Sequence, residues 1–281
     1  MEERPLSLKA RIMIWIAVFA AAIAGILYDS NFRFKTESFE LAAPGLPGSF
    51  DGFRIVQLSD LHGKEFGKDN KKLVQAVTEA RPDMIALTGD YRESAEDIAV
   101  TEKLVRQLTD IAPVYFVSGN HDWASGEIQT LFDTLQSCGV TSLHNEYVLL
   151  EKDGESIVLA GVEDPNSWAV MTQPDELVDI IKEEQGGKFT VLLGHRNYWI
   201  EKYPELEVDI ILCGHSHGGI IRLPLIGGLA GTGGEILPEY DKGLYRTENY
   251  SMLVSGGLGD VRGIPRFLNN PQVISLTLYA E

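Results

Sequence analysis

Short apolar runs of strand length recur along most of this chain, and they constrain its fold more than any other feature. Most of these runs are rich in β-branched residues and are bounded by Gly, Asp or Asn, which is typical of buried strands. Helix-period segments lie between the early runs, at about 70–80, 95–108 and 127–137. The order β-α-β-α-β, followed by strand-rich sequence, predicts an α/β sheet with a second sheet. The expected strands are Phe53–Leu58, Met84–Leu87, Val114–Val117, Ile157–Leu159, Phe189–Leu193, Ile210–Cys213, Met252–Val254 and Val273–Leu278.

Five of the expected strands run directly into Asp, Asn or His side chains. In open α/β sheets, ligands bind in the crevice beyond the carboxyl ends of the strands. Five of the six histidines of the chain lie at these strand ends. We therefore expect the five segments to form one site. The side chains concerned are Asp60, His62, Asp90, Asn120, His121, His195, His215 and His217.

The residue types in this set favour a metal site. Imidazole and carboxylate donors without a cysteine cluster suit divalent ions such as Mn, Fe or Zn. Asp60 and His62 are two residues apart in an extended segment and project to the same side, as do His215 and His217. Without His121, the set provides seven donors, which is too many for one tetrahedral ion. Seven donors suit two ions that share a carboxylate.

The order and spacing of these motifs resemble the signature of calcineurin-like metallophosphoesterases. The resemblance extends over residues 53–278, and all five motifs appear in the expected order. Residues 218–224, 238–245 and 257–259 resemble, more narrowly, the bacterial membrane-anchored branch of that superfamily. The motifs are Asp60-x-His62, Gly89-Asp90, Gly119-Asn120-His121-Asp122, Gly194-His195 and Gly214-His215-Ser216-His217.

The resemblance implies a four-layer αββα sandwich with a dinuclear metal centre. A hydroxide between the two ions would be the nucleophile, because two ions lower the pKa of bound water and bind both the attacking and the leaving oxygen. His121 would not bind metal; it would donate a proton to the departing alkoxide or stabilise its charge. The implied ligands are Asp60, His62 and His217 for the first ion, Asn120, His195 and His215 for the second, and Asp90 as the bridge between them.

Residues beside these motifs have two interpretations each. Glu93 could orient His121, as an acidic residue does in related phosphoesterases, or be an exposed carboxylate at a helix start. Arg196 and Arg222 could bind a substrate phosphate with paired hydrogen bonds, or be surface arginines. For Asp122, a role in shaping its turn is favoured over a part in the chemistry.

The N-terminal region contains an uncharged stretch, residues 12–28, at the lower length limit for crossing a bilayer. A retained membrane anchor is the favoured interpretation; a signal peptide cleaved near Ala22-Ile23-Ala24 is the alternative, with a soluble core helix behind both. Three basic residues precede the stretch and two follow it, which favours an inside N-terminus and an extracytoplasmic catalytic domain of a single-pass membrane protein. These residues are Arg4, Lys9 and Arg11 before it, and Arg33 and Lys35 after it.

The predicted organisation is an anchor at 1–28, a linker at 29–50 and a phosphoesterase domain at 51–281. The linker is polar at first and then contains Pro and Gly. The net charge of −17 argues against non-specific nucleic-acid binding, which requires basic residues. Two cysteines, Cys138 and Cys213, cannot form a disulfide framework.

The sequence predicts a dinuclear phosphoesterase that hydrolyses a phosphomonoester or phosphodiester by attack of metal-bound hydroxide. A membrane tether makes lipid-linked or envelope-derived phosphoesters attractive substrates. One alternative is hydrolysis of the pyrophosphate of UDP-2,3-diacylglucosamine, which some relatives perform with the same machinery. The other is a non-catalytic module that binds metal or protein partners, although such a module should lack ligands or the acid, and here all of them are present.

Overall fold

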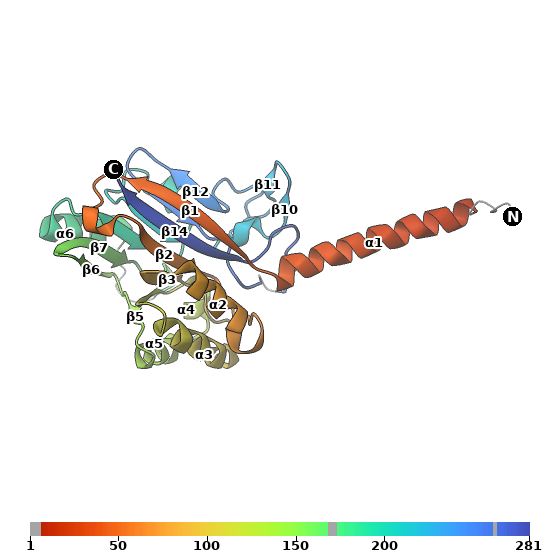
Figure 1. Cartoon of the computed structure of the whole chain (residues 1–281), viewed down its shortest axis with the longest axis horizontal. Helices are drawn as coiled ribbons and strands as arrows, with labels where there is room; N and C mark the ends of the chain where they lie inside the picture. The colour runs from red at the N-terminus through yellow and green to blue at the C-terminus, as the bar shows by residue number, and fades with distance from the viewer. Residues whose placement is uncertain (1–6, 168–172, 261–262) are drawn as a thin grey trace.

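Two six-stranded sheets stack face to face, and a long N-terminal helix projects away from them (Figure 1). The computed structural model describes residues 7–167, 173–260 and 263–281. Helices cover the outer face of each sheet, which gives four layers in the order α, β, β, α. The fold therefore confirms the expected αββα sandwich, preceded by one apolar helix.

The first sheet combines four parallel strands with an edge made by the two ends of the domain. β2, β3, β4 and β5 run parallel, β14 pairs antiparallel with β2, and β1 pairs parallel with β14. The carboxyl ends of β2, β3 and β4 therefore lie at the same edge of the sheet. In spatial order the strands are β1 (Lys35–Ala43), β14 (Gln272–Ala280), β2 (Phe53–Leu58), β3 (Met84–Thr88), β4 (Val114–Val117) and β5 (Thr141–Ser142).

The second sheet has a parallel centre with one antiparallel strand at each edge. β13, β9, β8 and β7 are parallel, and β12 and β6 flank them in the opposite direction. A separate hairpin of β10 (Arg222–Leu223) and β11 (Gly227–Gly228) follows β9 along the chain. In spatial order the strands are β12 (Gly243–Arg246), β13 (Ser251–Val254), β9 (Ile210–Cys213), β8 (Thr190–Leu193), β7 (Glu155–Gly161) and β6 (Glu146–Lys152).

The strand residues alternate between two apolar layers, as the period of two in a strand requires. In β9, Ile210 and Leu212 pack between the sheets, whereas Ile211 and Cys213 face the helices of the second sheet. Both faces of each sheet are thus covered. For this reason most central strands are runs of apolar residues, without the alternation of apolar and polar residues that a half-exposed strand shows.

Amphipathic helices supply the two outer layers. The helices on the first sheet and those on the second form separate apolar clusters with the outward-facing strand residues. The first set is α2 (Lys71–Ala80), α3 (Ile98–Thr109) and α5 (Ile128–Ser137), and the second is α6 (Pro174–Gln185) and α7 (Trp199–Lys202). Short helical turns complete the chain at η1 (Gly48–Phe50), η2 (Lys68–Asn70), η3 (Ala95–Asp97), α4 (Asn120–Ala124) and η4 (His217–Gly219).

The expected linker at 29–50 needs correction, because it contains part of the folded domain. Helix α1 (Leu8–Phe32) extends into this segment, and β1 (Lys35–Ala43) pairs with β14 along its full length. Leu41 and Ala43 are buried between the sheets. Burial alternates along β1 from Glu37 to Ala43. The sequence shows this alternation only weakly, because the inward-facing Glu37 is charged and the exposed Ala42 is apolar, and the strand was therefore missed.

Leu41→Ala is expected to lower the free energy of unfolding of the full chain by about 2–5 kcal/mol, because it leaves a cavity between the sheets. Urea denaturation in detergent would measure the effect. Glu40→Ala, at the exposed neighbouring position, is the matched control and should change stability little. Equal effects of the two substitutions would contradict the packing of β1 in the core.

α1 is long and apolar enough to cross a membrane, with a mean hydropathy of 2.2 over its best 18 residues. Its C-terminal end is held firmly against the domain. The buried side chain of Asn31 donates to the carbonyl oxygen of Arg266 and accepts from its N–H, each at 2.9 Å. Asn270 donates to the carbonyl oxygens of Asp29 at 2.8 Å and Arg33 at 3.0 Å. The helix therefore has a defined direction relative to the sheets.

Candidate metal centre

The loops that follow five strands meet between the two sheets at one edge of the sandwich. β2, β3 and β4 contribute from the first sheet, and β8 and β9 from the second. Backbone hydrogen bonds join these loops: the N–H of Asp60 donates to the carbonyl oxygen of Gly89, and that of Gly214 donates to the carbonyl oxygen of His195, both at 2.9 Å. Segments that are far apart in sequence thus form one rigid set of loops.

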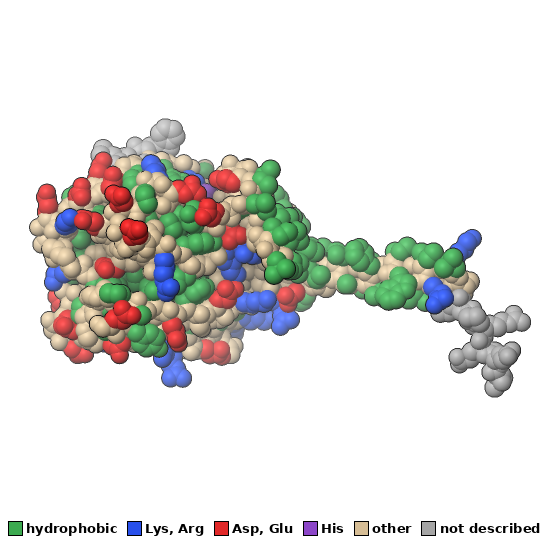
Figure 2. Space-filling model, turned by 90° about the horizontal axis from the view of Figure 1, so that it is seen from above, with side chains coloured by type: hydrophobic (Ala, Val, Ile, Leu, Met, Phe, Trp, Pro, Cys, Tyr) green, Lys and Arg blue, Asp and Glu red, His purple; other side chains and the backbone are tan. Residues whose placement is uncertain are grey.

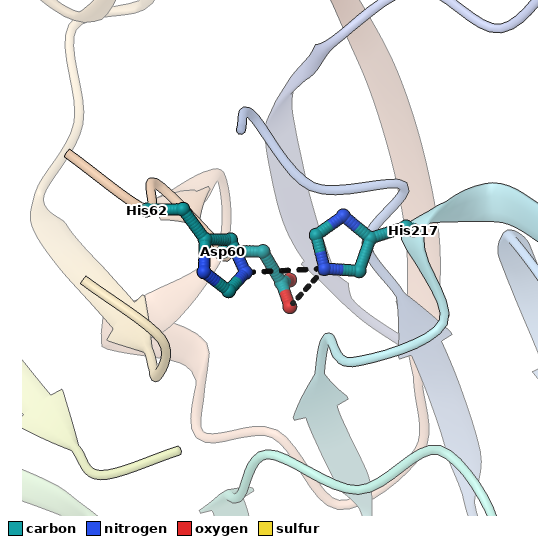
Figure 3. A group of neighbouring side chains, drawn as sticks. All are labelled: Asp60, His62 and His217. Carbon is teal, nitrogen blue, oxygen red and sulfur yellow. Dashed lines mark hydrogen bonds and ion pairs between the residues drawn. The ribbon is translucent and has the colours of Figure 1, made fainter. Parts of the chain in front are cut away.

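Asp60, His62 and His217 form the first group of donor atoms (Figure 3). The two histidine Nε2 atoms lie 3.2 Å apart, and His217 Nε2 lies 3.4 Å from Asp60 Oδ1. All three side chains are almost completely buried. Each offers one donor atom within 4.8 Å of the others, and a cation at this point would be in reach of all three.

Asp90, His195 and His215 form a second group with the same compactness. His195 Nε2 lies 3.2 Å from Asp90 Oδ2, and that same oxygen lies 3.7 Å from His62 Nε2 in the first group. Asp90 is therefore positioned between the two groups. Asp60 Oδ1 is also only 4.0 Å from His195 Nε2, so the groups adjoin each other.

Unpaired polar atoms in this region fit a cation. Within the part of the chain that the structure describes, Asn120 Oδ1 is buried and has no hydrogen-bond partner, and Asp90 Oδ2 and His195 Nε2 make no hydrogen bond of acceptable geometry although they are close. A buried polar atom without a partner costs free energy unless a ligand satisfies it. The donors are nitrogen and oxygen atoms, which suits borderline and hard divalent ions.

The electrostatics of the protein alone also favour bound positive charge. Burial opposes the charged form of His195, but Asp90 and Asp60 outweigh it and raise the pKa of His195 to about 10. Burial raises the pKa of Asp60. For Asp90, burial works toward the neutral form, but adjacent His195 brings the pKa well below its ordinary value. In the protein alone, the protonated His195 thus supplies the positive charge that the buried carboxylates require.

Unusual backbone angles bring these side chains into position. Five of the seven expected ligands have a positive φ between 48° and 70°, a region that costs free energy for residues other than glycine. Such strain persists where the surrounding structure enforces it, and it clusters at functional sites. The five residues are Asp60, His62, Asp90, His215 and His217.

Two glycines permit the close approach of the loops. A Cβ atom on Gly89, where φ is +86°, would lie 2.6 Å from His195 Nδ1 and 2.7 Å from the backbone nitrogen of Gly119. On Gly214, it would lie 1.9 Å from Ser59 Oγ and 2.4 Å from Asp60 Oδ2. Both glycines are thus required by space, and Gly89 is also required by its backbone conformation.

A second layer of hydrogen bonds orients the donors. His195 Nδ1 lies 2.8 Å from the carbonyl oxygen of Thr88, to which it donates a hydrogen bond, so that Nε2 is the atom that would bind an ion once its own proton is displaced. Asp122 is fully buried and accepts from four backbone N–H groups, namely those of Asp90, Gly119, Tyr91 and Arg92, at 2.8–3.2 Å. These bonds agree with the turn-shaping role expected for Asp122.

Asp122→Ala is expected to lower both metal content and stability. Each buried N–H group left without a partner should reduce the free energy of unfolding by about 1–3 kcal/mol. Metal content should fall because the loop of Asp90 is no longer joined to the loop of Asn120 through this carboxylate. Asp110→Ala, at an exposed helix end, is the control. Thermal unfolding and elemental analysis would measure the two effects. Metal content and unfolding temperature equal to those of the control would contradict this role.

His121 lies beside the donor groups but is more accessible, with 23% of its side chain exposed. Its Nδ1 is 3.0 Å from Glu93 Oε1, and the same carboxylate oxygen is 2.8 Å from His62 Nδ1. Of the two interpretations of Glu93, the contacts therefore favour orientation of His121. The carboxylate also contacts His62, which the sequence did not suggest.

The arginines differ in their surroundings. Arg196 is held by two contacts with Asp164, at 2.5 and 3.0 Å, and its Nη1 lies 3.0 Å from His215 Nε2. Arg222 instead binds Asp241 at 2.7 Å and the carbonyl oxygen of Gly218. Sequence reasoning missed Arg266, which is fully buried with Nη2 3.2 Å from His217 Nδ1; it lies outside every motif, so no local signal could have identified it.

Comparison with known proteins identifies the protein family of this chain. The family model described as calcineurin-like phosphoesterase matches residues 53–219, which include all five strand-end loops. The chain belongs to this family. The enzyme class expected from the sequence, a metal-dependent phosphoric ester hydrolase, is thereby confirmed.

Individual relatives of this phosphoesterase align over most of the chain. An uncharacterized metallophosphoesterase of Bacillus subtilis, YkuE, is 30% identical over 93% of this chain and 94% of its own length. Phosphodiesterase YaeI of Escherichia coli is 27% identical over 80% of this chain and 82% of its own. A Danio rerio protein named transmembrane protein with metallophosphoesterase domain is 28% identical over 97% of this chain, which spans 63% of that relative.

Proposed function

We propose that this phosphoesterase is tethered to a membrane by α1 and binds two divalent ions, Mn, Fe or Zn, between its sheets. The first ion would be held by the group around Asp60 and the second by the group around His195, with Asp90 shared. Bound there, the ions would polarise the phosphoryl group and supply an acidified water as nucleophile. The complete ligand set would be Asp60, His62, Asp90, Asn120, His195, His215 and His217.

One observation supports this proposal most strongly: the oxygen Oδ2 of Asp90 lies within 3.7 Å of a histidine nitrogen from each group. A carboxylate between two sets of donors is what two adjacent ions require. The unpaired Oδ1 of Asn120, on the neighbouring loop, offers a further ligand. The positive charge of the ions would also reverse the repulsion between these carboxylates and an anionic phosphoester.

His121 is the proposed catalytic residue. Its imidazole is partly exposed, and its Nδ1 contacts Glu93, which leaves Nε2 as the atom that can give a proton to the leaving oxygen. Glu93 would act as a positioning residue that fixes the ring through its contact with Nδ1. The proton would pass to the alkoxide as the phosphorus–oxygen bond breaks.

The membrane tether and the substrate class belong to the same proposal. α1 has the length and hydropathy of a membrane span, and a relative is named as a transmembrane protein. The excess of basic residues before the span favours an extracytoplasmic domain. The substrate is a phosphomonoester or phosphodiester, and a name among the relatives, phosphodiesterase, favours testing diesters first.

Turnover of nitrophenyl phosphoesters tests the proposed activity. The full chain in detergent would be freed of metal with a chelator and assayed with bis(p-nitrophenyl) phosphate and p-nitrophenyl phosphate, before and after Mn²⁺ addition. We expect activity only after addition, with two ions bound per chain. No turnover of either ester by protein that holds two ions would contradict the proposal.

A further inference from the structure

Exposed apolar side chains gather at the end of the domain from which α1 projects (Figure 2). Of the nine large apolar side chains described as exposed in residues 33–281, six lie between residues 225 and 268. Leu225 and Ile236 are the most exposed, at 108% and 85%. Soluble domains rarely leave such side chains together on the surface. We call this set the apolar rim: Leu225, Ile226, Ile236, Leu237, Ile264 and Leu268.

The rim comes from three loops that are joined to one another. Leu225 and Ile226 form the tip of the β10–β11 hairpin. The segment that contains Ile236 bonds back to this hairpin through a bridge with Ala230 and a hydrogen bond from Leu237 N to Leu229 O at 3.1 Å. A further bridge, Ile221 to Phe267, links the hairpin to the loop that contains Ile264.

The rim lies beside the C-terminal end of α1, and this position determines how deep the rim would sit in a membrane that α1 crosses. Ile264 and Pro265 line a cavity of 510 Å³ together with Ala24, Leu27 and Tyr28 of the helix; its described lining is mostly apolar, with Asp260 as the one charged residue. These helix residues belong to the uncharged stretch at 12–28. Because α1 is fixed to Arg266 and Asn270 by the hydrogen bonds of Asn31 and Asp29, the rim cannot move away from this end of the helix.

A bilayer that contains residues 12–28 must therefore reach the rim. The uncharged stretch covers only about 26 Å at 1.5 Å per residue, slightly less than the roughly 30 Å of a hydrocarbon core. Tyr28 and Phe32 continue its exposed apolar surface toward the domain. The apolar helix and the apolar rim thus adjoin each other at this end of the domain (Figure 2), and a single lipid phase would reach both.

The rim is also directly connected to the candidate metal centre. His217 begins the η4 turn that leads into the β10–β11 hairpin. Arg266 contacts His217 Nδ1 at 3.2 Å, and the side chain of Asn269 donates to the carbonyl oxygen of His217 at 2.7 Å. A surface held in the bilayer by this loop would keep the centre close to the lipid headgroups.

We propose that the apolar rim docks into the bilayer that holds α1, so that the metal centre receives phosphoesters from the lipid headgroup layer. The docking stands on the rim and helix alone, whereas the substrate class rests on the function proposed above. The net charge of −17 gives the protein as a whole no electrostatic attraction to an anionic membrane. Burial of apolar side chains is then the driving force, and the docking should be insensitive to salt.

Fluorescence of the full chain in nanodiscs tests the docking. The two native cysteines are buried, so an environment-sensitive nitrobenzoxadiazole label can be placed on Leu225→Cys in the rim. Ile180→Cys on α6, also an exposed apolar position, is the matched control. We expect doxyl-labelled lipid to quench the rim label and aqueous iodide to quench the control, at low and high salt alike.

Two results would overturn the docking. One is equal access of iodide to both labels in nanodiscs, which would place the rim in water. The other combines two findings: doxyl lipid in nanodiscs does not quench the rim label, and in lipid-free detergent the label is protected from iodide to a degree that depends on protein concentration. That second pattern would assign the rim to contact with another copy of the chain.

Vesicle assays test the substrate class with a double substitution in the rim, Leu225→Asp with Ile226→Asp. Phosphatidic acid and phosphatidylglycerol in phosphatidylcholine vesicles serve as lipid probes, and bis(p-nitrophenyl) phosphate as the soluble probe. We expect turnover of a lipid probe to fall on the order of tenfold, because carboxylates enter hydrocarbon unfavourably. Turnover of the soluble probe should be unchanged.

The outcomes separate the two proposals. Wild-type turnover of the soluble probe without turnover of either lipid, or an equal effect of the substitutions on both kinds of probe, would overturn the lipid substrate class and leave the phosphoesterase function intact. Failure of metal-loaded wild type on every probe would overturn the proposed function, while the fluorescence result would still decide the docking.

Discussion

Asp90→Ala is expected to abolish most metal binding and nearly all turnover. Asp90 lies between the two donor groups, so its loss removes a ligand from both ions at once. Loss of an outer partner of a ligand already costs about 10–100-fold in metal affinity, and a shared ligand should cost more than ~100-fold. Elemental analysis after gel filtration, together with turnover of bis(p-nitrophenyl) phosphate, would measure both effects.

Backbone strain is a second way in which Asp90→Ala could cause loss of metal and activity, and a control variant must test for it. Asp90 has a φ of 58°, where alanine is disfavoured. Asp153 is an exposed aspartate with a φ of 49°, so Asp153→Ala introduces similar strain far from the candidate centre. We expect Asp153→Ala to keep its metal and activity. Normal metal content in Asp90→Ala would show that the ligand assignment is incorrect.

His121→Ala is expected to separate catalysis from metal binding. Its imidazole belongs to neither of the two groups proposed to hold the ions; it lies instead with Glu93 and His62, and its Nδ1 is 3.0 Å from Glu93 Oε1. Removal of a general acid typically lowers the rate by about 10²–10⁴-fold. We therefore expect kcat to fall by about this factor while both ions remain bound, as measured by steady-state kinetics and elemental analysis on the same sample.

The leaving group provides the sharper test of His121. An ester of a good leaving group such as p-nitrophenol needs little protonation, so His121→Ala should affect it less than an alkyl phosphoester. His144→Ala is the matched control, since His144 pairs with Glu163 outside the donor groups. Equal rate losses for both leaving groups, or loss of metal, would contradict the role of a proton donor.

Most of the central fold follows from the sequence because its signal is local. Buried parallel strands such as β4 and β9 are continuous apolar runs, and their observed bounds match the expected ones. β1 could not be recognised in this way. It lies at the edge of its sheet, and what makes it a strand is pairing with β14, more than two hundred residues later in the chain.

In the candidate site, too, residues within local motifs could be predicted from the sequence, whereas residues that act through distant contacts could not. Motifs with fixed spacing identify residues such as Asp60 and His217, because the chemistry requires these residue types at strand ends. Arg266 and Asn31 have no motif, and their importance depends on contacts across the whole chain. The apolar rim likewise becomes visible only when three loops and the end of α1 are brought together.

Electron paramagnetic resonance of the Mn²⁺-loaded full chain tests the dinuclear centre most directly. Two Mn²⁺ ions that share Asp90 would lie close enough for magnetic exchange. We predict two ions per chain and a multiline spectrum of an exchange-coupled pair, converted by Asp90→Ala into a weak signal of isolated or free ions. One ion per chain with the simple six-line spectrum of isolated Mn²⁺ would contradict the account.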